Sequence, residues 1–170
     1  MEGRGVAVHD LQDLLAQAVD QAPGARGFVL DRMITAHAVG PCVARALRPW
    51  LDALDGAALA RRLLGGIVVA DVPRAELPAL LRSELPGDAF LTPALPNAMF
   101  QRDPSSWVYG GVIFNQMRMP VRRPETLLQR AVCRFHPMFV QAEFETWWGD
   151  ADDDFQNARI EGGDVMPLGA

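Results

Sequence analysis

At Pro86-Gly87 the chain changes from helical periodicity to a sequence in which proline, glycine, aromatic and β-branched residues predominate. Before this point, apolar residues recur with the spacing of one helix face, and turn residues separate the repeats. After it, strand-like and helix-like segments alternate. The pattern predicts an α/β chain in two parts: a helical bundle in residues 1–85 and a mixed helix-and-strand part in residues 86–170.

Five short amphipathic helices account for the first part. Asp10 is a candidate cap for the first helix, and Pro23-Gly24 ends it. Gly65-Gly66 ends the fourth helix, whereas Pro49 and Pro78 fall inside predicted helices and indicate a kink or a start nearby. Short helices joined by tight turns are typical of a compact bundle. We expect helices over residues 8–19, 26–39, 43–54, 55–64 and 74–85.

The second part combines one clear helix with short strands. Residues 107–115 (WVYGGVIFN) are the best candidate strand, and Gly110-Gly111 within it indicates a bulge or a close backbone approach. Pro124 suits the first turn of a helix that His136-Pro137 ends. We therefore expect a helix over 124–135, a strand over 144–148, a solvated acidic turn rather than a metal site over 150–154, and an extended segment over 159–168.

The charge balance excludes one class of partner. All 16 basic side chains are Arg, and the 21 acidic ones give a formal net charge of -5. An acidic chain without a basic block does not match the polyanionic backbone of nucleic acids. The absence of Lys beside abundant Ala is typical of a GC-rich genome, so an Arg is not by itself evidence for guanidinium chemistry at its position.

The sequence also argues against metals, disulfides and membranes. Two cysteines, Cys42 and Cys133, make neither a disulfide framework nor a metal knuckle, and both lie in apolar helical stretches typical of inert buried thiols. His9, His37 and His136 have no second ligand at metal spacing. No apolar run is long enough to cross a bilayer, and the N-terminus does not resemble a secretory signal. We expect a cytoplasmic protein.

Asn97, Phe100 and Asp103 form the first candidate site, at intervals of three residues in a proline-flanked segment that we expect to be extended. An amide, an aromatic ring and a carboxylate in a loop are typical of a cleft mouth. The carboxylate of Asp103 could accept a bidentate pair from a planar cation. The structural alternative is that Asp103 caps the turn at Pro104 or pairs with Arg102.

Glu161 and Asp164 form the second candidate site, on either side of a glycine pair. Glycine lets a backbone approach a ligand closely, and an extended segment would place the two carboxylates on opposite faces. One could face a pocket while the other secures the turn. The alternative is an ordinary acidic turn.

Arg122 and Arg123 precede the predicted helix of the second part. An Arg at this position could hold a substrate carboxylate. The alternative is a pair of solvated surface arginines.

Taken in order, these segments resemble the arginine deiminases. The segment LPNAMFQRD resembles the family's Pro-Asn-x-x-Phe-Thr-Arg-Asp motif, and PSSWVYGGVIFN is similar to the stretch that follows it. The segment VRRPETLLQRAV resembles the next helix, and EGGDV is similar to the second carboxylate motif. The helices before Pro86 resemble the helical bundle inserted in these enzymes. The resemblance covers nearly the whole chain.

The resemblance implies a fold and a reaction. The fold is the pentein-type α/β propeller of the guanidine-modifying superfamily, so residues 86–170 would be a partial propeller and residues 1–85 its helical insert. The reaction is the hydrolysis of L-arginine to L-citrulline and ammonia in arginine catabolism, in which a Cys thiolate attacks the guanidinium carbon and a His acts as acid and base. The resemblance implies no metal or organic cofactor. It also implies that the full-length parent is a homo-oligomer.

The resemblance further implies roles for six residues. Asp103 would bind the guanidinium nitrogens, and Glu161 would lie beside the substrate and orient the catalytic His. Arg122 and Asn97 would hold the substrate's carboxylate. Phe100 would pack on its methylenes, and Asp164 would support the site without contacting the substrate.

Several positions depart from the family pattern. Gln101 replaces a Thr, Ser106 stands where Cys is common, and residues 115–119 are less apolar and aromatic than the family version. We also expect the chain to be a fragment, because the first propeller blade and the motifs with the catalytic His and the nucleophilic Cys have no counterpart in it. It would then supply guanidinium contacts but no nucleophile, and make no citrulline above an Asp103→Ala control.

Two alternatives remain open. The chain could be a non-catalytic remnant or interaction protein of the same family. It could instead belong to a related guanidine-modifying enzyme that acts on agmatine, methylarginine or an amidino donor. Arg122 favours free arginine over agmatine, which lacks a carboxylate.

Overall fold

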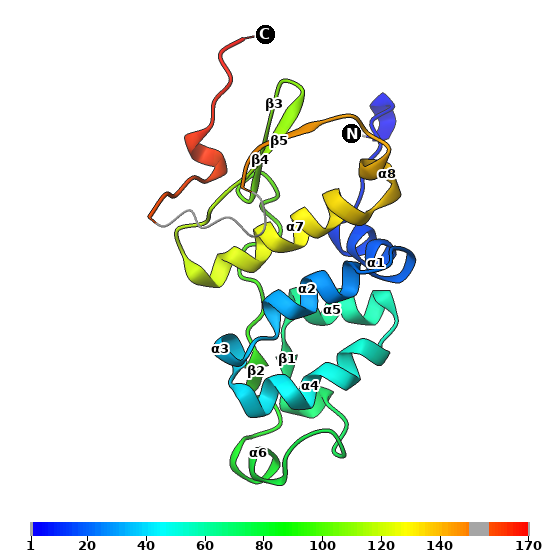
Figure 1. The fold of residues 1–170 in the computed structure, drawn as a ribbon, viewed down its shortest axis with the longest axis vertical. Helices are drawn as coiled ribbons and strands as arrows, with labels where there is room; N and C mark the ends of the chain where they lie inside the picture. Colours follow the sequence, from blue (N-terminus) through cyan, green and yellow to red (C-terminus); the bar gives the residue numbers. More distant parts are fainter. Residues whose placement is uncertain (1, 150–156, 170) are drawn as a thin grey trace.

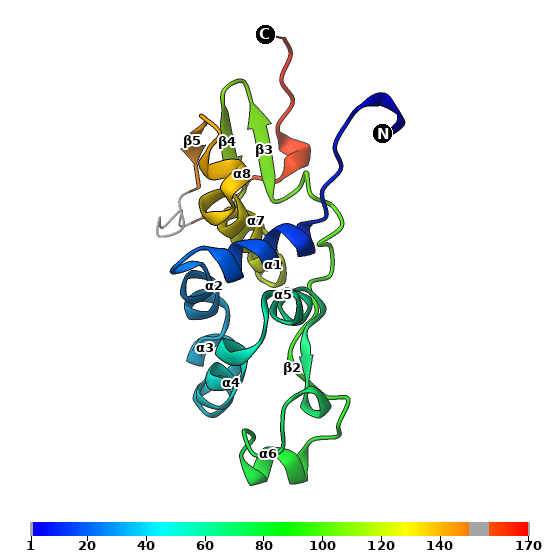
Figure 2. The ribbon, with the colours of Figure 1, turned by 90° about the vertical axis from the view of Figure 1, so that its right-hand side faces the viewer.

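A computed structural model describes residues 2–149 and 157–169 of the chain. It is a mixed α/β structure with helices and two small sheets. Figure 1 shows the three-stranded sheet at one end, α7 beneath it, and the helices of the first part beyond α7. The same order of layers appears in the perpendicular view of Figure 2. The acidic run at 150–154 lies outside the described residues.

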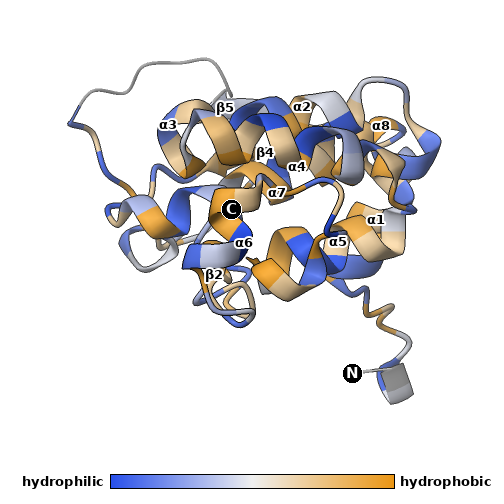
Figure 3. Ribbon diagram, turned by 90° about the horizontal axis from the view of Figure 1, so that it is seen from below, coloured by the Kyte–Doolittle hydropathy of each residue, from blue (hydrophilic) through white to orange (hydrophobic). Residues whose placement is uncertain are grey.

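The helix α1 (Leu11–Gln21) begins where the sequence predicted its cap. The Asp10 side chain accepts a hydrogen bond from the backbone N–H of Gln12 at 2.7 Å. In the same way, Asp55 caps α5 (Gly56–Gly65) by accepting from the N–H of Ala58. The two helices pack so closely that a side chain at Gly56 would overlap the backbone of α1. Figure 3 shows hydrophobic and hydrophilic residues alternating along both helices, as expected for helices with one buried face.

The helix predicted over 26–39 is two helices, α2 (Ala25–Met33) and α3 (Ala36–Val39). Thr35 interrupts it, because its side chain accepts from the N–H of Ala38 and caps α3. The α4 helix (Pro41–Ala53) continues through Pro49. The last predicted helix is shorter than expected, since α6 (Ala79–Glu84) begins only after Pro78.

A short antiparallel ladder joins the two parts of the chain. The strand β1 (Ile67–Val68) pairs with β2 (Phe90–Thr92) across the change of pattern at Pro86. A two-residue strand has too few positions to show alternation, so sequence periodicity did not predict it. Between them, a 3-10 turn covers Val69–Asp71. Another, Glu2–Arg4, lies near the N-terminus.

The single strand predicted over 107–115 is a hairpin of β3 (Ser105–Val108) and β4 (Gly111–Phe114). Its turn has a positive φ of 54° at Tyr109, a conformation usually taken by glycine. The predicted close approach is confirmed at Gly111, where an added side chain would overlap the ring of Trp147. The turn was missed because a Tyr occupies the left-handed position.

A helical crossover follows the hairpin. The chain runs through a 3-10 turn (Pro120–Arg122), α7 (Arg123–Phe135) and α8 (Pro137–Val140) to β5 (Glu145–Trp148), which pairs parallel to β4. Parallel neighbours need such a connection, and a helix is the usual one. The sheet order β3-β4-β5 and α7 thus form one ββαβ unit.

One hydrophobic cluster crosses the proposed division at residues 85 and 86. It includes Leu15 of α1, Leu47 of α4 and Leu59 of α5 together with Leu128 and Val132 of α7. The α7 helix packs against α1 and α2 as well as beneath the sheet. The helical part therefore supports the helix that begins directly after Arg122. Among the described residues, no helix is long and apolar enough to cross a membrane.

Candidate functional site

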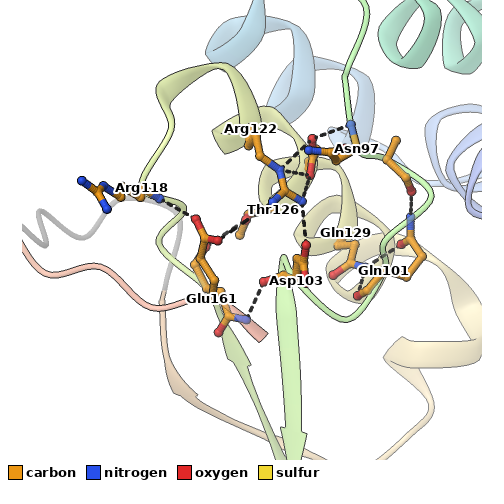
Figure 4. Close-up of polar contacts among 11 residues, drawn as sticks. Asn97, Gln101, Asp103, Arg118, Arg122, Thr126, Gln129 and Glu161 are labelled. Atoms are coloured by element: carbon orange, nitrogen blue, oxygen red, sulfur yellow. Dashed lines mark hydrogen bonds and ion pairs between the residues drawn. The ribbon is translucent and has the colours of Figure 1, made fainter. Parts of the chain in front are cut away.

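Arg122 lies at the centre of a cluster of three carboxylates. Its Nη2 donates to Asp103 Oδ2 at 3.0 Å and to Glu125 Oε2 at 2.9 Å, and its Nε donates to Glu125 Oε2 at 3.1 Å. Its Nη1 lies 4.0 Å from Glu161 Oε2. Figure 4 shows the Arg122 guanidinium directed toward Asp103 and Glu161. The structure thus brings three of the six predicted residues together around one cation.

The four charged side chains of this cluster differ in how far they are exposed to solvent. Arg122 is 9% exposed and Glu125 2%. The side chains of Asp103 and Glu161 are 35% and 33% exposed. Burial by itself would lower the pKa of Arg122, but hydrogen bonds to Glu125 and Asp103 outweigh it and raise that pKa above its ordinary value. Arg122 therefore stays charged, and the two carboxylates that solvent reaches are Asp103 and Glu161.

The alternative interpretations of Arg122 and Asp103 can now be compared with the geometry. Arg122 is not a solvated surface arginine, whereas its neighbour Arg123 is exposed. Asp103 pairs with Arg122, and the guanidinium of Arg102 instead donates to the carbonyl of Val165 at 3.4 Å.

The 95–103 segment is folded in turns, so the prediction of an extended segment is wrong. The N–H of Phe100 donates to the carbonyl of Asn97 at 2.9 Å, and that of Asp103 donates to the carbonyl of Phe100 at 3.1 Å. The N–H of Asn97 also donates to Glu125 Oε1 at 3.2 Å. Consecutive turns bring Asn97 and Asp103 to the first turn of α7. Phe100 is 54% exposed, and its role stays a prediction.

The EGGD segment is also turned rather than extended. Residues Gly162–Asp164 form a 3-10 turn in which the Asp164 side chain accepts from the N–H of Glu161 at 2.9 Å. The Glu161 side chain also accepts from the backbone N–H of Arg118, to its Oε1, at 3.0 Å. Asp164 thus fixes the backbone of Glu161, which is the arrangement that a supporting role requires.

Gly162 lets the two carboxylate segments meet. Its N–H donates to the carbonyl of Asp103 at 3.2 Å, and an added Cβ would overlap the carbonyl oxygen of Arg102. Gly163 has open space at the same position. The glycine pair had suggested a close approach to a ligand. The close approach that the structure shows depends on Gly162 and is made to the backbone beside Asp103.

Buried polar contacts hold the Asp103 segment from below. The side chain of Asn115, fully buried, donates to the carbonyl of Asp103 at 2.7 Å and to Ser106 Oγ at 3.0 Å. Gln129 of α7 donates to the backbone carbonyl of Gln101 at 2.8 Å. Gln101 and Ser106, at which the resemblance led us to expect other residues, thus take part in fixing the segment together with Asn115.

Sequence reasoning missed Glu125, the buried partner of Arg122. The signal was present, because an acidic residue three positions after an Arg lies on the same helical face. Its place in the first turn of α7 also favours a negative charge. It was overlooked because the segment around it was interpreted only as a helix.

The two thiols lie in different surroundings. Burial raises the pKa of Cys133 to about 12, so it is protonated at neutral pH. Cys42 is exposed on α4, which corrects the prediction that it is buried. In Figures 1 and 2, α4 lies beyond α7 and α2 from the β3 strand that follows Asp103.

His136 contacts α1 rather than the cluster around Arg122. His136 is buried, and its Nε2 lies 2.9 Å from Gln17 Oε1. Residues 2–149 and 157–169 hold no group of three or more His, Cys, Asp or Glu that could bind a metal ion.

A cavity of about 790 Å³ lies beside the start of α7, and its lining includes Val121 and Arg123, the neighbours of Arg122 in the sequence. Its lining includes Arg32, Arg62 and Arg123 but none of the six predicted residues. We therefore base the candidate site on the contacts around Arg122. In a comparison with protein families, the model described as arginine deiminase matches residues 1–170 of this chain.

Proposed function

This chain belongs to the arginine deiminase family, and on that premise we propose that the carboxylates around Arg122 bind the guanidinium group of L-arginine for hydrolysis to L-citrulline and ammonia. Asp103 and Glu161 would be the acceptors. The ββαβ unit would then be one blade of a pentein-type propeller, with the helices of residues 1–85 as its insert. A cytoplasmic location and a homo-oligomeric parent stay predictions.

The observation that carries the proposal is the guanidinium already bound there. The Arg122 side chain lies 3.0 Å from Asp103 and 4.0 Å from Glu161, so the spacing of these carboxylates suits a planar cation. Because both side chains are about one-third exposed, a ligand from solvent can reach them. Glu125 cannot serve in this way, since its side chain is almost fully buried.

Binding of L-arginine requires a shift of Arg122. A substrate guanidinium at Asp103 would compete with the Arg122 Nη2 contact, whereas the substrate carboxylate would attract the same Arg122. The two ends of L-arginine are separated by its methylenes, so one position of Arg122 cannot serve both contacts. We propose that Arg122 leaves Asp103 and, with Asn97, binds the substrate carboxylate while Phe100 packs on the methylenes.

In this proposal, the carboxylates bind the guanidinium, and a separate nucleophile attacks its carbon. The carboxylates fix the orientation of the guanidinium and of its carbon, which is the electrophile. Glu161 would in addition orient a catalytic His, with Asp164 holding its backbone. We propose that neither cysteine of the chain is the nucleophile, because Cys133 is a protonated buried thiol and Cys42 lies on the far helix α4.

Calorimetric titration of the 170-residue chain with L-arginine tests the proposal. We expect binding that weakens about tenfold or more in Asp103→Asn, since a charge-assisted pair is lost. Asp13→Asn, which removes the same charge at an exposed position on α1, is the matched control and should bind as the wild type does. Equal affinities in all three proteins would overturn the assignment of Asp103.

A citrulline assay on the same samples tests the division of labour. We expect no citrulline above the level given by Asp103→Ala. Citrulline formation above that control would show that a nucleophile is present in the chain after all.

Agmatine is the second candidate ligand, and one observation favours it. Arg122 is engaged by Glu125 and Asp103, so it is not placed to receive a ligand carboxylate without moving. A ligand that lacks a carboxylate would not need that movement. Titration with agmatine beside L-arginine separates the two, because tighter binding of agmatine would favour this candidate.

A further inference from the structure

Glu125 makes contacts that none of the other carboxylates makes. It lies in the first turn of α7, and its carboxylate accepts from Nε and Nη2 of Arg122 at 3.1 and 2.9 Å. The same carboxylate accepts from the backbone N–H of Asn97 at 3.2 Å. One buried side chain therefore joins the two residues proposed to hold the carboxylate end of the ligand.

The burial of Glu125 makes this link rigid. A carboxylate removed from water is costly unless a cation and hydrogen-bond donors compensate it, and Arg122 and the Asn97 N–H provide both. At 2% exposure, Glu125 is not accessible to a ligand from solvent. Its influence on a ligand must therefore act through Arg122 and the turn at Asn97.

The geometry also determines which edge of Arg122 is available. Glu125 occupies the Nε edge of the guanidinium, so the remaining N–H groups point toward Asp103 and Glu161, as Figure 4 shows. Without Glu125, the cation would be free to pair more fully with Asp103. It would then compete with any guanidinium ligand and would no longer be held for a ligand carboxylate.

We propose that Glu125 is a positioning residue that holds Arg122 and the Asn97 turn for a ligand carboxylate and thereby sets the preference for L-arginine over agmatine. This inference rests on the proposed function. It differs from a purely structural role of Glu125, which would affect both ligands equally.

The test compares dissociation constants for L-arginine and agmatine in the wild type, Glu125→Gln and Glu125→Asp. In Glu125→Gln, we expect the ratio of agmatine to L-arginine dissociation constants to fall about tenfold, since an Arg–carboxylate contact to the ligand is lost. Glu125→Asp keeps the charge but shortens its reach, so its ratio should fall between the other two. Glu76→Gln, at an exposed position before α6, is the matched control and should leave the ratio unchanged.

A ligand-free readout separates this inference from the proposed function. The Arg122 Nε–H, observed by NMR, should exchange slowly with solvent in the wild type and rapidly in Glu125→Gln. Equal exchange in the two proteins would overturn the positioning role, whatever the ligands do. Equal weakening of both ligands in Glu125→Gln would also overturn it. A wild type that binds neither ligand would overturn the proposed function, and the ligand preference with it.

If Glu125→Gln does not fold, Glu125→Asp carries the same comparison. A ligand ratio identical to that of the wild type in Glu125→Asp would then count against the inference, and a reduced ratio would support it.

Discussion

Arg122 Nη2 donates to Asp103 Oδ2 at 3.0 Å, so the residue proposed to bind a substrate guanidinium already binds one from its own chain. The contact spans 19 residues and joins the turn after Asn97 to the start of α7. Its strength determines how readily an external cation can replace Arg122. The predictions below start from this contact and from the backbone that supports it.

Replacing Arg122 with Met should destabilise the fold and change ligand selectivity together. The buried carboxylate of Glu125 would lose its cation, which should cost about 3 kcal/mol of unfolding free energy. Because the internal competitor for Asp103 is gone, agmatine should bind at least as well as to the wild type, whereas L-arginine should bind more weakly. Urea unfolding and calorimetry measure the two effects.

The double variant Arg122→Met with Glu125→Gln provides the control for the stability effect. The Gln side chain removes the unpaired charge but can still accept from the N–H of Asn97, so part of the lost stability should return. A double variant that is less stable than Arg122→Met would show that the buried charge is not the cause.

The two glycines of EGGD should respond differently to the same substitution. In Gly162→Ala, the added methyl would overlap the carbonyl of Arg102, which should separate Glu161 from Asp103 and cost roughly 1–3 kcal/mol. Gly163→Ala meets open space and serves as the matched control. L-arginine titration and thermal unfolding should therefore change in the first variant only. The same loss in both variants would contradict the proposed close approach.

The two cysteines should differ in reactivity. In the folded protein at pH 8, iodoacetamide should modify the exposed Cys42 and leave Cys133 unmodified, because burial holds the Cys133 thiol protonated. Unfolding in urea should make both react. Peptide mass spectrometry distinguishes the sites, and equally fast labelling of both in the folded protein would contradict the burial of Cys133.

His136 should make stability fall in mild acid. Burial, and then the charge of His9, lowers the pKa of His136 below its ordinary value of 6.5 in the folded state. The unfolded chain therefore binds a proton first, and the stabilisation is complete above about pH 6.5 and is lost as the pH falls below it. The folded state favours the neutral form of His136 because Nδ1 must stay unprotonated to accept from the N–H of Met138 at 3.2 Å.

Thermal unfolding between pH 5 and pH 7.5 measures this effect. In His136→Asn, the melting temperature should fall less in acid than that of the wild type. His37→Gln removes an exposed histidine and should keep the wild-type dependence. An unchanged dependence in His136→Asn would contradict the assignment.

Local sequence signals predicted the elements that have local causes. Asp10 caps its helix as expected, and α7 begins and ends at most one residue from the prediction. The break at Thr35 was missed because a threonine cap competes with apolar periodicity that runs on through it. The ladder of β1 and β2 was missed because each strand is stabilised by a partner about 24 residues away rather than by its own pattern.

The candidate site could be predicted by residue type but not by contact. The sequence pointed to Asp103, Arg122 and Glu161, yet it could not show that Arg122 pairs with Asp103, because the pairing depends on how the turns stack on α7. Glu125 was missed although its spacing from Arg122 is local. The buried support from Asn115 depends on contacts with residues 9 and 12 positions earlier, which no periodicity reports.

Ser106, for which the resemblance led us to expect Cys, shares a buried hydrogen bond of 3.0 Å with Asn115, from Asn115 Nδ2 to Ser106 Oγ. A change at either position alone leaves the other residue with a weakened or missing partner beneath Asp103. The two positions are therefore epistatic: a mutational path that returns Ser106 to the Cys common in the family passes through a less stable intermediate unless position 115 changes with it. Transplanting such a residue from a relative, one site at a time, should fail here where a paired exchange succeeds.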